Sequence, residues 1–142
     1  FVAPLTFRSL SGRPVYTDLF IDESQAALVH IGLAEWMQIL VIAPATSNSV
    51  AKFVRGISDT LVTNFFAQAG KARVPILVYP TDLAPEMDSA GPRGESVRVY
   101  PRAIDLDNTT KLRTFAGVRI VNSREELEHS LSAALEPGLC GS

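Results

Sequence analysis

An almost continuously apolar run from Met37 to Ala43 stands between mixed, more polar segments. Such a run is typical of a central parallel strand that is covered on both faces, and Pro44 is expected to end it because proline cannot donate to a strand ladder. After a polar turn, apolar residues recur at three- and four-residue spacing, which predicts one long amphipathic helix that ends near Gly70. The apolar positions of this helix are Val50, Phe53, Val54, Ile57, Leu61, Phe65 and Phe66.

Further apolar segments continue an alternation of strands and helices. Strands are expected at 74–79 and 118–121, and helices at 4–12 and from Ser123 onward. A strand, a helix and a second strand form a βαβ unit, whose right-handed crossover makes the two strands parallel. The pattern therefore predicts an α/β fold of the Rossmann-like (flavodoxin-like) type, with three layers around a parallel sheet. The glycine-rich segment 89–99 is expected to be a flexible loop.

The last predicted helix has a clear start and a clear apolar stripe. Ser123 is expected to cap it, with acidic residues in the first turn. Leu127, Leu131 and Leu135 form the stripe that we expect to pack on the sheet. His129 lies at helical spacing away from most of this stripe and is therefore expected at the surface.

Composition is that of an ordinary globular protein. The 142 residues are 46% hydrophobic and 20% charged, and residues 1–142 are expected to form a single domain. A formal net charge of -2 predicts no attraction to nucleic acid or to an anionic membrane. No apolar run is long enough to span a membrane and no signal-peptide pattern is present, so a cytoplasmic location is expected. The single Cys140 rules out an intramolecular disulfide.

The polar turn after the first strand is the candidate binding site. In open α/β sheets, ligands bind beyond the carboxyl ends of the strands, where Thr46, Ser47, Asn48 and Ser49 stand at the start of a helix. Their side chains can cap orphan amides, and the amides favour an anion or an electron-rich ring edge. Spacing alone leaves open whether these residues bind a ligand or whether one is an ordinary cap and the others are solvated.

His30 precedes the same strand and is the candidate proton-transfer residue. A histidine can take or give a proton near neutral pH, which suits a catalytic base. The alternative is a structural histidine that is hydrogen-bonded to a backbone carbonyl. The residues alone do not choose between these interpretations.

Three segments agree in order and spacing with a known family. They are His30-Ile31-x-Leu33-Ala34-x-Trp36, the run VIAPATSNSVAK at 41–52, and Gly56-Ile57-x-Asp59-x-Leu61-x-Thr63. On these residues the chain resembles the homo-oligomeric flavin-containing cysteine decarboxylases. That family includes phosphopantothenoylcysteine decarboxylase of coenzyme A biosynthesis and the decarboxylases of C-terminal peptidyl cysteines. The run 44–49 is similar to the family's Pro-Ala-Ser-Ala-Asn-Thr, with conservative departures at Thr46, Ser47 and Ser49.

The resemblance implies an FMN-dependent decarboxylase, a carbon-carbon lyase that acts on a small-molecule or peptide cysteine as a homotrimer or a multiple of trimers. His30 would be the base for the substrate thiol. Cys140, within a Gly-Leu-Cys-Gly segment similar to the family's substrate clamp, would be a second catalytic residue. Oxidation of the thiol to a thioaldehyde would let the neighbouring carbon lose CO2 as an ene-thiolate, chemistry that the cofactor supplies. The implied cofactor contacts are Pro44, Ala45, Thr46, Ser47, Asn48, Asp59 and Phe7.

The chain departs from the family where the substrate carboxylate would bind. The family's Pro-Ala-Met-Asn corresponds either to Pro80 followed by Thr81-Asp82-Leu83, in which the Asn is lost, or to 85–88, in which Asp88 replaces it. An acidic group would repel a substrate carboxylate unless it is protonated or charge-compensated. The candidate substrate contacts are Asn48, Asp82, Met87 and Asp88.

The family's first βαβ unit, with its Gly-Ser phosphate-binding turn, has no counterpart ahead of the Pro4 helix. A flavoprotein domain that is incomplete at the N-terminus is therefore expected, with the turn supplied by a longer protein or by another chain. Two other classes of function stay open. One is a non-catalytic FMN-binding subunit or regulatory flavoprotein of the same fold, and the other is a nucleotide-binding α/β domain without flavin.

Overall fold

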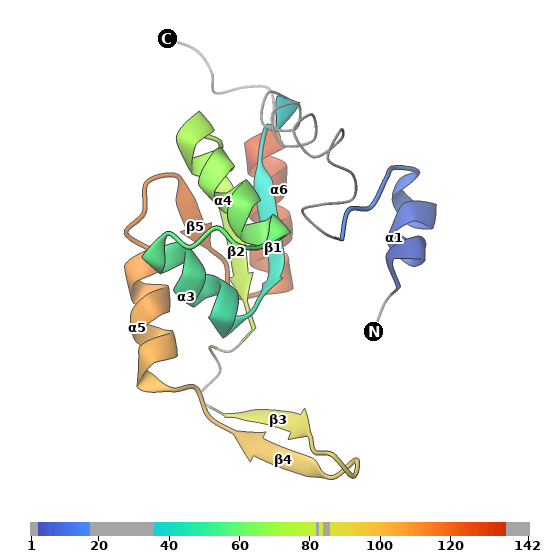
Figure 1. Ribbon diagram of the computed structural model, residues 1–142, viewed down its shortest axis with the longest axis vertical. Helices are drawn as coiled ribbons and strands as arrows, with labels where there is room; N and C mark the ends of the chain where they lie inside the picture. The colour runs from blue at the N-terminus through green and yellow to red at the C-terminus, as the bar shows by residue number, and fades with distance from the viewer. Residues whose placement is uncertain (1–2, 18–35, 82, 84–85, 136–142) are drawn as a thin grey trace.

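The computed structural model describes residues 3–17, 36–81, 83 and 86–135 (Figure 1). Its centre is a parallel sheet in the order β1 (Leu40–Ala45), β2 (Ile76–Pro80) and β5 (Val118–Ile120). In Figure 1, α3 (Ser47–Arg55), α4 (Leu61–Ala72) and α5 (Ala103–Leu112) lie on one face of this sheet and α6 (Arg124–Leu135) lies on the other. The predicted α/β, Rossmann-like fold with three layers is confirmed.

The first strand differs from its prediction in both position and burial. β1 begins at Leu40 instead of Met37 and continues through Pro44 to Ala45. It tolerates the proline because its register with β2 shifts between Ile42 and Ala45. Among the described strands, β1 pairs only with β2, and of its six residues only Ile42 and Ala45 are buried. The strand with both faces covered is instead β2, because α4 packs on one face of it and α6 on the other.

The predicted long helix is wrong, because the structure divides it into α3 and α4. Gly56 ends α3 in the left-handed conformation at φ 71°, and its amide bonds back to the carbonyls of the last turn. Thr60 then starts α4 with a capping box, in which its side chain and that of Thr63 each accept from the other residue's backbone amide. The second helix ends at Ala72, past the predicted stop at Gly70.

The core lies between the sheet and the helices α3, α4 and α5. The rings of Phe53 and Phe66 stack with centroids 4.2 Å apart and an interplanar angle of 13°, which joins α3 to α4. Val50 near the start of α3 and Ala45 at the end of β1 belong to the same buried cluster. The buried residues of the cluster are Ile42, Ala45, Val50, Phe53, Val54, Phe66, Ala69, Ile76, Val78, Leu112 and Ile120.

The segment predicted as a flexible loop is a β-hairpin. β3 (Met87–Ala90) and β4 (Ser96–Val99) pair antiparallel, and Gly91 donates to the carbonyl of Glu95 at 2.7 Å to close the turn. The hairpin forms because alternating β-branched residues in β4 favour an extended strand. In Figure 1 it projects from the three-layer body, beyond the end of β2.

The first and last helices confirm most of their predictions. α1 (Pro4–Ser11) ends at Gly12, which has φ 65°. Ser123 caps α6 by accepting from the amide of Glu126 at 3.0 Å, and His129 is exposed as predicted. The prediction for Leu135 is wrong, since its side chain is 52% exposed. In the part of the chain that the structure describes, no helix has both the length and the hydropathy that crossing a membrane requires.

Candidate functional site

The turn between β1 and α3 places a helix start at the carboxyl edge of the sheet. Thr46 is the N-cap, in extended conformation, and its Oγ1 accepts from the amide of Ser49 at 3.3 Å. Its carbonyl accepts from the amide of Val50 at 3.0 Å. The amide of Asn48 lies in the first turn of α3, where backbone amides have no intrahelical carbonyl to donate to. Thr46 is therefore the N-cap among these four polar residues.

The last residues of β1 hold this turn in place from beneath. Ala45 is 1% exposed, whereas Pro44, Thr46 and Asn48 are all exposed. The carbonyl of Ala45 accepts from the backbone amide of Thr81 at 3.1 Å and from its Oγ1 at 3.4 Å. The turn therefore presents polar groups to solvent on a rigid base.

Thr81 is a positioning residue that the sequence analysis missed. It follows β2 directly, at the same edge of the sheet as the end of β1, and bonds the two strand ends together. Its position in the sequence could have indicated this role, because a hydroxyl residue just after the second strand of a βαβ unit lies at the ligand-binding edge of the sheet.

Asp59 is bonded to Lys52. The Nζ of Lys52 donates to both carboxylate oxygens, at 2.9 Å and 2.8 Å. These hydrogen bonds hold the pKa of Asp59 below its ordinary value. Lys52 lies five residues along α3 from Ser47, a rise of about 7.5 Å. The pair ties the loop between α3 and α4 to the second half of α3, and the predicted contact of Asp59 with a cofactor stays a prediction.

Arg102 and Asp105 form an ion pair at the start of α5. The guanidinium donates in a fork to both carboxylate oxygens, at 2.9 Å and 2.8 Å, and the Asp105 carboxylate also accepts from the Arg102 amide at 3.2 Å. The hydrogen bonds from Arg102 hold the pKa of Asp105 below its usual range. Sequence spacing alone did not indicate this pair, which fixes the beginning of α5.

The remaining predicted contacts are distributed over peripheral elements. Phe7 is 54% exposed on α1, which Figure 1 shows apart from the sheet. Met87 is half-buried and Asp88 exposed, both in β3. Asp88 lies opposite Arg98 in the hairpin register, and the guanidinium of Arg98 pairs with the carboxylate of Glu86 at 3.4 Å. The roles of these residues stay predictions.

Three predicted site residues lie outside the described part of the chain. They are His30 and Cys140, the proposed catalytic residues, and Asp82, one of the candidate substrate contacts. Their assignments stay predictions.

Comparison with known proteins identifies the family of this chain. The model of the Flavoprotein family matches residues 1–137. The chain therefore belongs to the Flavoprotein family. The predicted resemblance to flavin-containing proteins is confirmed.

Individual relatives cover different parts of the chain. The coenzyme A biosynthesis bifunctional protein CoaBC of Bacillus subtilis is 38% identical over 80 residues, which are 56% of this chain and 19% of CoaBC. The FMN complex of DmrB from Burkholderia xenovorans, described as a cubic protein cage for redox transfer, has a TM-score of 0.75 and 38% identity over 90% of this chain and 69% of DmrB. SpaF, an FMN-dependent cysteine decarboxylase, has a TM-score of 0.68 and 26% identity over 95% of this chain and 71% of SpaF.

These relatives confirm some predictions at a coarse level. The chain spans about half, or less, of the length of the curated relatives it matches. FMN as the predicted cofactor is confirmed by the family and by the FMN complex among the relatives. The relatives include cysteine decarboxylases and an oligomeric cage. The substrate, the homotrimer and the cytoplasmic location stay predictions.

Proposed function

We propose that the full protein binds FMN at the carboxyl edge of the sheet and decarboxylates a cysteine-containing substrate, either phosphopantothenoylcysteine or a C-terminal peptidyl cysteine. The observation that carries this proposal is the exposed start of α3, capped by Thr46 and held by Thr81. The donors present suit a flavin ring edge, which offers oxygen and nitrogen acceptors. The side chain of Asn48 is exposed and makes no hydrogen bond to another residue that the structure describes.

Each residue of the turn has a defined task in this proposal. The amide and side chain of Asn48 donate to the ring edge, and Pro44, Ala45, Thr46 and Ser47 contact the flavin beside it. His30 takes the proton of the substrate thiol, and Cys140 gives a proton late in the reaction. FMN, when bound, supplies the two-electron oxidation of the thiol. Phe7 and Asp59 complete the cofactor contacts.

In this proposal, the hairpin and the segment before it bind the substrate. Asp82, Met87 and Asp88 face the substrate in this proposal. Arg98 lies opposite Asp88 in the register and is paired with Glu86 at 3.4 Å; in this proposal its guanidinium donates to a substrate carboxylate. The protein would assemble as a homotrimer or a multiple of trimers in the cytoplasm.

A second candidate is a flavoprotein that transfers electrons without decarboxylation. Two observations favour it. The identity to DmrB, 38%, exceeds the identity to SpaF, 26%. In addition, the family's Asn is missing from both possible alignments of its Pro-Ala-Met-Asn, since Leu83 or Asp88 stands in its place. This candidate keeps the same flavin contacts but assigns no substrate role to the hairpin.

The first experiment is the visible absorption spectrum of the purified full-length protein, with mass analysis of what denaturation releases. Released FMN is expected. A colourless protein that also fails to take up added FMN would refute both candidates. The holoprotein is then incubated with each cysteine substrate and analysed by mass. Loss of CO2 alone identifies the coenzyme A reaction, and loss of CO2 with two hydrogens identifies oxidative decarboxylation of a peptide.

Two variants separate the proposed roles. Asn48→Ala is expected to weaken FMN binding about tenfold, as for the loss of one hydrogen bond, whereas Gln68→Ala, an amide on α4, should leave it unchanged. His30→Asn should abolish turnover and leave FMN bound. If neither substrate changes mass but the bound flavin is reduced by a nicotinamide and passes electrons to an acceptor, the redox-transfer candidate holds.

A further inference from the structure

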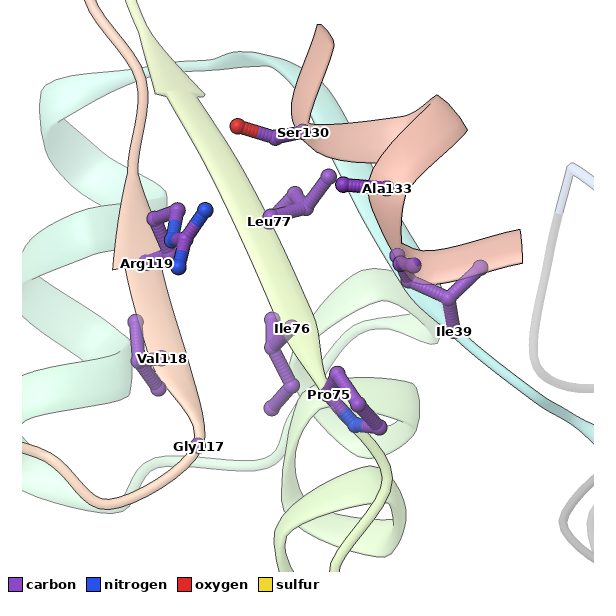
Figure 2. A pocket seen from close by; sticks show the side chains of 10 residues that line it. Ile39, Pro75, Ile76, Leu77, Gly117, Val118, Arg119, Ser130 and Ala133 are labelled. Atoms are coloured by element: carbon purple, nitrogen blue, oxygen red, sulfur yellow. The ribbon is translucent and has the colours of Figure 1, made fainter. Parts of the chain in front are cut away.

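A cavity of about 370 Å³ lies between α6 and the amino ends of the sheet strands (Figure 2). Its walls include residues that directly precede β2 and β5, and residues from the last turns of α6. It is therefore at the opposite edge of the sheet from the proposed flavin site. The cavity is lined by, among others, Ile39, Leu77, Arg119, Ser130 and Ala133.

Arg119 brings a cation to a sheet face that is otherwise apolar. Leu77 and Arg119 are neighbours in the register between β2 and β5, so their side chains stand on the same face. Adjacent residues such as Ile76 and Ile120 join the core on the other face. Leu77 is only 4% exposed, because α6 covers this face. The guanidinium of Arg119 thus rises beside a buried leucine and into the cavity, as Figure 2 shows.

No carboxylate from the described residues neutralises Arg119. The carboxylate of Glu126 on α6 accepts from the Asn122 amide at 2.8 Å, and that of Glu128 accepts from Arg124 at 2.7 Å. Within the ranges that the structure describes, the ion pairs involve other residues. The guanidinium therefore has its five donors available to a ligand.

Ser130 supplies a second polar group that is almost fully buried. It is 5% exposed and its hydroxyl has no hydrogen-bond partner among the described residues. Every side-chain oxygen of the described residues that is fully shielded from solvent has a hydrogen-bond partner. Because the Ser130 hydroxyl has none, it is not fully shielded, and it reaches the cavity surface. Figure 2 shows its oxygen pointing from α6 over the sheet. A buried hydroxyl facing a cavity is satisfied when a ligand offers an acceptor.

We propose that this cavity binds a small carboxylate with an apolar body. The carboxylate pairs with the Arg119 guanidinium, whose fork matches two oxygens, and accepts a hydrogen bond from Ser130. The apolar body lies against Ile39, Leu77 and Ala133. The volume and the largely apolar lining are those of small-ligand sites, in which a few polar groups fix the orientation. One guanidinium and one hydroxyl suit a monoanion better than a phosphate, which presents more acceptors.

The test is a calorimetric titration of the full-length protein, with its flavin, by octanoate. Saturable one-site binding is expected, and octanol, which has the same body without charge, should bind at least about tenfold more weakly. Inorganic phosphate should not compete. Absence of saturable octanoate binding, as when another part of the full chain fills the cavity, would overturn the proposal. Equal binding of octanol would also overturn it.

Matched variants then assign the contacts. Arg119→Gln should weaken octanoate about tenfold or more, whereas Arg55→Gln, an exposed arginine at the end of α3, should leave binding unchanged. Ser130→Ala should weaken octanoate several-fold without lowering the Tm of the ligand-free protein, because the hydroxyl loses no protein partner. The flavin spectrum should be the same in all variants, which separates this site from the proposed function. Octanoate binding that is insensitive to Arg119→Gln would refute the proposal.

Discussion

The break between α3 and α4 depends on the backbone conformation of Gly56. This residue has φ 71° and ψ 25°, directly after Arg55, and a Cβ added to it would meet nothing within 4 Å. Gly70 also has free space around its Cα but lies inside α4 with ordinary helical geometry. Substitution of either glycine by alanine therefore tests the backbone alone. We expect Gly56→Ala to destabilise the fold and Gly70→Ala to stabilise it.

The magnitudes follow from the two conformations. A residue with a Cβ in the left-handed region costs about 1–2 kcal/mol, while alanine also restricts the unfolded chain and returns about 0.4–1 kcal/mol. Gly56→Ala should therefore lower the free energy of unfolding by about 1 kcal/mol. In a helix interior, glycine is worse than alanine by about 0.5–1 kcal/mol, so Gly70→Ala should raise the free energy of unfolding by that amount.

The assay is urea unfolding of the full-length protein, followed by far-ultraviolet circular dichroism, with the slope of each transition compared between variants. Midpoints that move in opposite directions at a constant slope are expected. If one continuous helix ran from Val50 to a stop near Gly70, as the apolar spacing alone predicts, Gly56 would be an interior helical position. Gly56→Ala would then be stabilising, and that result would refute the division into two helices.

Three further predictions concern contacts around α3. Thr46→Ala should lower the free energy of unfolding by about 1 kcal/mol, measured by denaturant midpoint, whereas Thr46→Ser should keep most of the cap. Lys52 lowers the pKa of Asp59 below 3.8, so its stabilising effect is full above that pH and is lost as the pH falls through the folded value. The stability difference between wild type and Asp59→Asn should therefore disappear on acidification; a difference that persists would contradict the pair. A double-mutant cycle of Phe53→Leu and Phe66→Leu should give a coupling of about 0.5–1.5 kcal/mol, and a coupling of zero would exclude the stack.

The order of strands and helices could be predicted because the spacing of apolar residues differs between strands and helices. Residues 74–79 and 118–121 are short apolar runs, and the structure places β2 and β5 within or beside them. The site edge could be predicted for the same reason. A strand that runs into a polar helix start must place that start at the carboxyl edge, and Thr46 is found there as the cap.

The helix break and the hairpin could not be predicted from the same periodicity. Apolar spacing continues from Val54 through Ile57 to Leu61 as it would in an unbroken helix. The helix nevertheless ends because Gly56 adopts the left-handed backbone conformation. In the segment 89–99, Gly91 and Gly94 indicated a loop, but the turn they form is short enough to let β3 and β4 pair. Both errors arise at glycines, because a glycine in a sequence can indicate either a flexible segment or a sharp, well-defined turn.

The α6 interface shows why a ligand cavity escapes a hydrophobic pattern. The leucine stripe predicted that long side chains would fill the space over the sheet, yet the residue most deeply buried on this helix is Ser130. Ala133 follows one turn later, also with a small side chain, and Arg119 stands across from them. Small residues opposite the long side chain of Arg119 leave an unfilled volume. The spacing of apolar residues predicts which face of a helix is buried, but it does not predict how completely the space over that face is filled. The two edges of the sheet therefore differ in kind. The carboxyl edge offers backbone amides fixed by topology, whereas the amino edge offers side chains whose available space is decided by packing.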